Sequence, residues 1–214
     1  NIENKNDVQS ISNLTDKDLD HLSIRKKEFV KVVLPIIINE NQNILSTRSF
    51  VIDLKKKLNT FKTLNNSDIK KLNNIAKKYN IKHSNKHKLD LINEILNNVD
   101  IIPNSIVLAQ AAIESGWGKS RFARDHNALF GEYTYDQDKG VLPLKRDLGA
   151  KHFIKSFSSY DNSVASYFNN INSHNAYKDF RLLRQIMRSK NNFSDILLLV
   201  NKLDSYAEDN NYID

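Results

Sequence analysis

Apolar residues recur every three to four positions along most of this 214-residue chain. Such spacing is typical of helices that bury one face. Between residues 130 and 157 the period shortens: Tyr133 and Tyr135 alternate with polar residues and Gly140 marks a turn, which predicts a small β-hairpin lobe. Helical spacing resumes at Val164. The sequence therefore predicts an α+β chain that is predominantly α, with one short β excursion.

The composition supports a mainly helical chain with a buried core. Glycine and proline number only 5 and 3, while 40% of the residues are hydrophobic and 27% are charged, as in globular proteins. No cysteine is present, so neither a disulfide framework nor a thiolate metal site can form. The longest apolar stretch, residues 29–38, contains Lys31 and Pro35 and is shorter than the roughly 20 residues that span a bilayer. We therefore expect no stable membrane insertion.

The N-terminal segment differs in character from the rest of the chain. Residues 1–22 are mostly polar with isolated apolar positions, and we expect a flexible arm there. Helical spacing begins at Ile24, and Pro35 is expected to kink or divide the helix that follows. The chain starts at Asn1 without an initiator methionine or an apolar signal segment. We take it for a mature or trimmed form whose export signal, if any, is not shown.

One residue, Glu114, combines an apolar setting with a carboxyl group. It ends the apolar run SIVLAQAAIE, residues 105–114, and Gly116 is a natural helix stop. Helical geometry places Glu114 above Val107, with Gln110 beside it. A carboxyl held against apolar side chains has a raised pKa and stays available as a proton donor, which glycosidic cleavage requires. On these grounds alone, an ordinary polar residue at the end of a buried helix is the simpler interpretation.

The segments around Glu114 resemble a known family. The run AQAAIESGWGKSRFA is followed by NALFGEY, by FSSYDNSVASYFNNINSHNAYKDFR and by SYAEDNNY, in that order. These segments resemble the Bax-like N-acetylglucosaminidases, which belong to glycoside hydrolase family seventy-three within the lysozyme-like superfamily. The resemblance covers roughly residues 100–212. It implies a lysozyme-like glucosaminidase domain over residues 100–214 and an N-terminal helical extension, residues 23–99, packed on that domain.

The resemblance also implies the roles of several residues. Glu114 is the implied general acid for a β-1,4 bond of peptidoglycan, between N-acetylglucosamine and N-acetylmuramic acid. Tyr206 is implied to lie in the cleft near the acetamido group of the reacting sugar. Trp117, between Gly116 and Gly118, resembles the turn that fixes the catalytic helix, and we expect its indole to pack behind that turn. The aromatic candidates for the cleft floor, each equally well explained as core, are Phe130, Tyr133 and Tyr177.

The second carboxylate is not fixed by any motif. An inverting enzyme needs a general base roughly 6.5–9.5 Å from the acid, and the β-lobe offers four candidates: Glu132, Asp136, Asp138 and Asp147. A substrate-assisted route, in which the acetamido oxygen is the internal nucleophile, needs no such base. We favour that route slightly, with Tyr206 positioning the acetamido group. Inversion at the anomeric carbon would exclude it.

Other functions are less well supported by the sequence. His83 and His87 lie four residues apart without a third ligand, so we expect neither a metal nor any other cofactor. The formal charge of +7 suits polyanions, but no nucleic-acid motif accompanies it. The expected partner is the glycan strand of peptidoglycan in the bacterial envelope, periplasmic or secreted, with the oligomeric state left open. The alternatives are a lytic transglycosylase or muramidase and a non-catalytic peptidoglycan-binding module.

Overall fold

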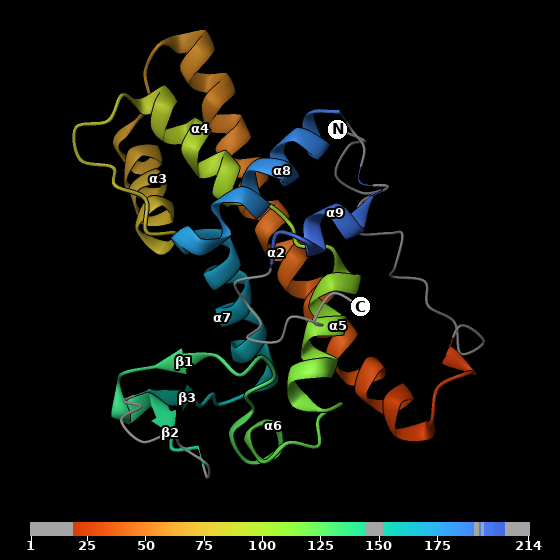
Figure 1. Cartoon of the computed structure of the whole chain (residues 1–214). Coiled ribbons are helices and arrows are strands. Elements are labelled where there is room, and N and C mark those ends of the chain that lie inside the picture. Colours follow the sequence, from red (N-terminus) through yellow and green to blue (C-terminus); the bar gives the residue numbers. More distant parts are fainter. Residues whose placement is uncertain (1–18, 144–151, 191–192, 194, 204–214) are drawn as a thin grey trace. The chain divides into compact units, whose positions relative to one another are not determined.

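The computed structural model describes residues 19–143, 152–190, 193 and 195–203 (Figure 1). These residues form two compact units, each assembled from segments that are distant in the sequence. The helical unit comprises residues 41–102 and 169–203, and the sheet unit comprises residues 19–40 and 103–168. The described chain is mainly helical with one small antiparallel sheet. This confirms the predicted α+β class with predominant helix and agrees with a lysozyme-like fold.

The longest helix, α2 (Ile24–Phe61), contributes residues to both units. It contains Pro35, which has no amide hydrogen to donate and normally interrupts a helix. Val33, Leu34 and Ile37 are nevertheless buried on either side of this proline, and their burial stabilises the helical path through it. The sequence predicted that Pro35 would kink or divide the helix. The division does not occur, because α2 continues through Pro35.

The helical unit contains four helices besides the end of α2. They are α3 (Asn66–Lys78), α4 (Lys88–Asn98), α8 (Lys178–Ser189) and α9 (Ile196–Val200), with the last part of α7 and the short 3-10 turn η3 (Asn175–Tyr177). Asn65 caps α3 because its side chain accepts a hydrogen bond from the Asp68 amide. The apolar faces meet in a core whose fully buried members include Leu54, Leu72, Ile92, Ile95 and Phe180.

The sheet unit contains the first part of α2 and the remaining elements. These are α5 (Asn104–Ser115), α6 (Arg121–His126), β1 (Tyr133–Thr134), η2 (Gln137–Lys139), β2 (Gly140–Val141), β3 (Phe153–Lys155) and most of α7 (Tyr160–Ser173). The strands pair antiparallel in the order β1–β3–β2, so the lobe has one strand more than the predicted hairpin. Tyr133 lies opposite Ile154, and Gly140 lies opposite Lys155. A Cβ atom at Gly140 would lie 2.5 Å from that of Phe153, so only glycine fits this crossing.

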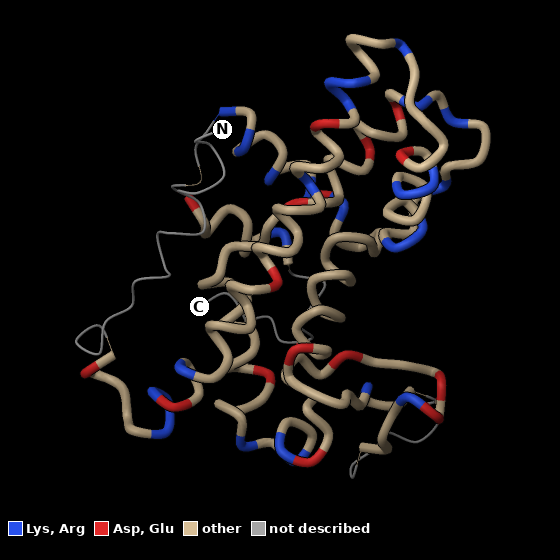
Figure 2. The backbone as a smooth tube through the Cα atoms, turned by 180° about the vertical axis from the view of Figure 1, so that it is seen from behind, with Lys and Arg blue, Asp and Glu red and all other residues tan. Residues whose placement is uncertain are grey.

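Charged side chains are distributed along the whole described chain. Figure 2 shows that Lys and Arg, in blue, form no single run. None of the helices in the described ranges combines the length and the hydropathy that a bilayer-spanning segment requires.

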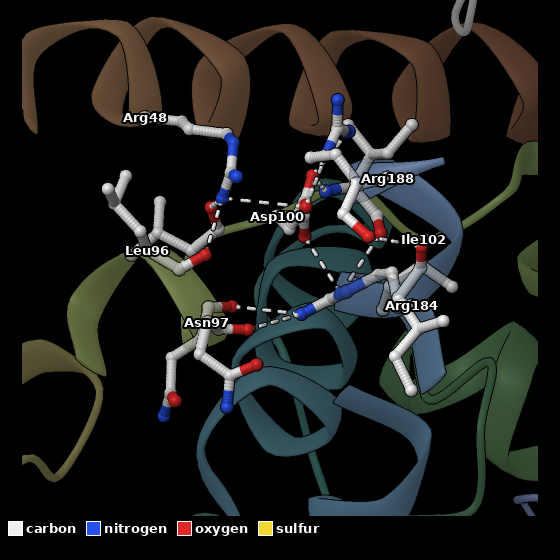
Figure 3. A network of polar contacts seen from close by, with 12 residues as sticks. Arg48, Leu96, Asn97, Asp100, Ile102, Arg184 and Arg188 are labelled. Atoms are coloured by element: carbon white, nitrogen blue, oxygen red, sulfur yellow. Dashed lines mark hydrogen bonds and ion pairs between the residues drawn. The ribbon is translucent and has the colours of Figure 1, made fainter. Parts of the chain in front are cut away.

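One group of charges is buried in the helical unit (Figure 3). Arg188 donates to both oxygens of Asp100, each at 2.6 Å. Arg184 is fully buried and donates to the carbonyls of Asn97 and Asn98 at the end of α4, while Arg48 donates to those of Leu96 and Val99. The last carbonyls of a helix lack partners within it. These two arginines therefore satisfy the buried end of α4.

Candidate active site

The helix that carries Glu114 ends in an unusual turn. Gly116, Trp117 and Gly118 have φ angles of 57°, 57° and 73°, and the left-handed region costs a residue with a Cβ atom about 1–2 kcal/mol. Ser115 holds the turn: its hydroxyl donates to the Ala111 carbonyl at 2.5 Å and accepts from the Gly118 amide at 2.8 Å. The end of α5, and with it Glu114, is thereby fixed.

Trp117 packs on the long helix α2 within the sheet unit. Its ring meets that of Phe29 edge to face, with centroids 5.7 Å apart, and the Lys26 ammonium lies 4.6 Å from the indole centroid. Aromatic and cation–π contacts of this kind each contribute about 0.5–1.5 kcal/mol. They offset the strained backbone of Trp117, as expected for a residue that packs behind the turn.

The Glu114 carboxyl is half-buried, and its environment raises its pKa. Loss of hydration disfavours the charged form, which places the pKa of Glu114 above its ordinary value. Among the described residues, no hydrogen bond or ion pair reaches this carboxyl. A Cβ atom at Gly131 would lie 3.5 Å from Glu114 Oε2, so the backbone of Gly131 borders the carboxyl. Glu114 is thus a carboxyl suited to giving a proton.

A second carboxylate, Glu132, follows Gly131 directly. Its side chain is only 4% exposed, and its Oε2 lies 3.0 Å from Lys155 Nζ. The Ser166 hydroxyl donates to the same oxygen at 2.5 Å. The other oxygen, Oε1, is buried and has no hydrogen-bond partner among the described residues. Glu132 is therefore held through one oxygen, in a segment that borders Glu114.

A buried polar pair lies one turn before Glu114 on α5. The Tyr167 hydroxyl donates to Gln110 Oε1, while Gln110 Nε2 is buried without a partner among the described residues. The ring of Tyr167 stacks on Phe130 with centroids 4.1 Å apart. Phe130 is only 2% exposed, so this cleft-floor candidate is a core residue in the structure.

The other predicted site residues that the structure describes form no hydrogen bond or ion pair with the Glu114 carboxyl. Asp136 and Asp138 are exposed, and a hydrogen bond from Lys139 lowers the pKa of Asp136. Tyr133 is 54% exposed and lies against His152 with ring centroids 4.2 Å apart. Tyr177 is buried in the helical unit. Asp147 and Tyr206 lie outside the described residues.

Comparison with known proteins decides the family. Residues 89–214 match the family described as mannosyl-glycoprotein endo-beta-N-acetylglucosaminidase. Protein bax of Escherichia coli (strain K12) is 33% identical over 193 residues, which cover 88% of this chain and 67% of that protein. The chain belongs to the glucosaminidase family. No solved structure matches it.

Membership of the glucosaminidase family confirms the resemblance predicted from the Glu114 segments. This glucosaminidase is a glycoside hydrolase by family, acting on glycans. The match includes the whole of α5, the sheet and α7. The two carboxylates that border Gly131 therefore both lie in the matched region.

A hollow of about 340 Å³ lies beside Trp117 in the sheet unit. Its lining includes Phe29, Val32, Arg25 and Lys119 and does not include Glu114. The described part of the chain holds no group of three or more His, Cys, Asp or Glu side chains that could bind a metal ion.

The residues that support the site of this glucosaminidase were not predicted from the sequence. Lys155 and Ser166 bind Glu132, and Tyr167 binds Gln110, yet none of these was singled out. Ser166 carried the only usable signal, since a serine among Val164, Tyr167 and Phe168 stands near the apolar face of a predicted helix. No local pattern marks Lys155, because its contact depends on the pairing of β3.

Proposed function

We propose that this glucosaminidase cleaves the β-1,4 bond between N-acetylglucosamine and N-acetylmuramic acid in peptidoglycan, with Glu114 as the general acid. The observation that carries the proposal is the Glu114 carboxyl, which burial holds at a raised pKa at the fixed end of α5. A protonated carboxyl is what departure of the glycosidic oxygen requires. The polymer substrate places its action in the bacterial envelope, either periplasmic or secreted.

We further propose Glu132 as the second carboxylate. Of the three candidates among the described residues, it is the one whose neighbour Gly131 borders the Glu114 carboxyl, and one of its oxygens has no hydrogen-bond partner in this part of the chain. Asp136 is engaged by Lys139 on the exposed face of the lobe. A glutamate beside the acid can serve as the base that activates water. This proposal replaces the slight preference for substrate assistance that the sequence suggested.

The acid is tested by replacing Glu114 with Gln. Release of reducing ends from purified sacculi should fall by about 10²–10⁴-fold, the usual contribution of a general acid. Glu40→Gln is the matched control, because Glu40 is also partly buried on a helix of the sheet unit. Wild-type activity in Glu114→Gln would remove Glu114 from the mechanism.

The products separate the neighbouring functions. Mass spectrometry of digested sacculi should show hydrolysed ends that carry reducing N-acetylglucosamine. Anhydro-muramic ends would identify a lytic transglycosylase instead, and reducing muramic acid would identify a muramidase. Binding of the wild type to sacculi with no release of fragments would identify a wall-binding module.

The second carboxylate is tested by stereochemistry. If Glu132 activates water for direct displacement, NMR of the first product should show inversion at the anomeric carbon, and Glu132→Gln should lower kcat by about 10²–10⁴-fold. Retention together with an active Glu132→Gln variant would support the acetamido route, and Tyr206→Phe would then be the variant that loses activity.

A further inference from the structure

The Glu132 carboxylate is held from one side only. Lys155 on β3 and Ser166 on α7 both bind Oε2, at 3.0 and 2.5 Å, and Lys155 Nζ lies 3.3 Å from the Ser166 hydroxyl. The Lys155 ammonium, the Ser166 hydroxyl and Glu132 Oε2 are therefore all in contact with one another. Oε1, on the same carboxylate, is buried without a partner in the part of the chain that the structure describes.

A carboxylate with a purely structural role looks different in this same chain. Asp100 accepts from Arg188 at both oxygens and from the Ile101 amide at Oδ1. More than nine in ten buried polar groups in proteins have a hydrogen-bond partner. Oε1 of Glu132 is the one carboxylate oxygen among the buried side-chain atoms that lack a partner within the described residues. An unpaired buried acceptor is destabilising. A water molecule or a substrate hydroxyl that donates to Oε1 would remove this cost.

The backbone makes this arrangement rigid. The Lys155 amide donates to the Glu132 carbonyl at 2.7 Å, which keeps the two residues side by side at the end of the β1–β3 ladder. Ser166 is followed on α7 by Tyr167, whose hydroxyl donates to Gln110, one turn before Glu114. Consecutive residues of α7 therefore bind the Glu132 carboxylate and the helix that carries Glu114.

We propose that Lys155 and Ser166 are positioning residues, which fix Glu132 through Oε2 and reserve Oε1 for the water that attacks the sugar. This rests on the proposed function, with Glu132 as the general base. As the water oxygen bonds to the anomeric carbon, Oε1 takes one proton from it. The bond from that carbon to the glycosidic oxygen breaks, and Glu114 gives its proton to the departing oxygen. Solvent then carries a proton from Glu132 back to Glu114.

The proposal is tested with Lys155→Met and Ser166→Ala, assayed on soluble glycan strands prepared from sacculi. Misplacing a catalytic group by about 1 Å can lower the rate by about 10²-fold, so kcat should fall by about 10–10²-fold with KM within about twofold. Lys155→Arg, which keeps the charge and the donors, should recover most of kcat. Lys57→Met is the matched control, because Lys57 also pairs with a largely buried carboxylate, that of Asp68, in the helical unit.

The Glu132→Gln background separates positioning from mere stability. A residue that acts through Glu132 has nothing further to lose once Glu132 is gone. Lys155→Met should therefore lower kcat in the wild-type chain and leave kcat of Glu132→Gln unchanged. The double variant also removes both charges together, which guards against the misfolding that one unpaired buried charge can cause. All rates are referred to folded protein, measured by circular dichroism at the assay temperature.

Two results would overturn the proposal. One is wild-type kcat per folded molecule in both Lys155→Met and Ser166→Ala, with only the melting temperature lowered. The other is an equal loss of kcat from Lys155→Met with and without Glu132. Glu114→Gln on the same strands reports the proposed function separately. If it is inactive while both positioning variants keep their kcat, the positioning proposal alone fails.

Discussion

At the scale of single residues, the partial burial of Glu114 determines how activity should depend on pH. Loss of hydration raises the pKa of this carboxyl above its ordinary value, which is about 4.3 for glutamate. A general acid works only while protonated, so kcat should fall as the pH rises through the raised pKa of Glu114. Measuring kcat from pH 3 to 9 checks this. A fall centred at the ordinary glutamate pKa would show that the acid is a solvated group and not Glu114.

Gly131 gives a second prediction at the same scale. Its φ angle is 61°, and a Cβ atom there would lie 3.5 Å from Glu114 Oε2. Gly131→Ala should lower the free energy of unfolding by about 1–2 kcal/mol through the left-handed backbone. It should also lower kcat by up to about 10²-fold, because the added methyl group constrains the acid. Chemical denaturation and steady-state kinetics measure the two effects.

Gly116→Ala is the control for this prediction. Gly116 has a φ angle of 57°, and no atom lies within 4 Å of the Cβ that alanine would add. The loss of stability should be similar, and the loss of kcat should be clearly smaller. Equal losses of kcat would attribute both effects to backbone strain instead of contact with Glu114.

The sequence could single out Glu114 as the candidate acid, whereas it could not indicate the surroundings of this residue. The apolar run and Gly116 place Glu114 at a helix end, and the flanking motif that resembles the glucosaminidases implies its role. Gly131 and Glu132 are 17 and 18 positions further on, and their approach to Glu114 depends on how the chain folds back after α6. Of the four candidate carboxylates, the sequence offered no physical reason to choose Glu132, because its burial comes from β3 and α7.

At the scale of elements, the end of α4 depends on a buried group of charges. Arg184 and Arg48 bind its last carbonyls, and Asp100 supplies the opposite charge. Burial alone would raise the pKa of Asp100, but Arg184, Arg48 and Arg188 together outweigh it and hold the pKa below its ordinary value. The carboxylate therefore stabilises the fold in its charged form.

Replacing Asp100 by Asn should destabilise the chain by about 3–5 kcal/mol at neutral pH, because the buried arginines lose their counter-charge. A lowered pKa gives stability that is complete above the unfolded pKa of about 3.9 and is lost as the pH falls through the folded pKa. The gap between wild type and variant should therefore narrow below about pH 4. Urea unfolding at pH 7 and pH 3 measures it.

Asp53→Asn is the control for Asp100→Asn. Asp53 is 59% exposed and pairs with Lys56 on α2, and exposed pairs contribute only about 0–1 kcal/mol. An Asp100→Asn variant as stable as Asp53→Asn would show that the arginines bind the carbonyls of α4 without needing the carboxylate.

Elements differ in how far the sequence predicts them. Three-to-four spacing predicted a mainly helical chain, and Gly116 predicted the end of α5, because these signals are local. Pro35 was expected to kink or divide α2, and the burial of Val33, Leu34 and Ile37 favours one continuous helix over two separate ones. Arg184 reads as an ordinary surface cation of α8. Its burial depends on carbonyls more than 80 residues earlier in the chain, which no local pattern can indicate.

At the scale of the whole molecule, both compact units are composite. The sheet unit draws on residues before 41 as well as on residues 103–168, and the helical unit draws on residues 41–102 as well as on those after 168. The sequence places a domain boundary near residue 100, between an extension and a glucosaminidase domain. That boundary stays a prediction, and the composition of the two units makes it testable.

A fragment of residues 100–214 should not fold cooperatively. It lacks Phe29, Val30, Val33 and Leu34, which are buried in the sheet unit, and each buried side chain of this size contributes about 1.5–3 kcal/mol. Their sum is comparable to the whole stability of a typical domain, about 5–15 kcal/mol. The full chain and a variant lacking residues 1–18, most of the predicted arm, should both melt in one sharp transition. A fragment that melts sharply and releases reducing ends from sacculi would instead establish residues 100–214 as a self-sufficient catalytic domain.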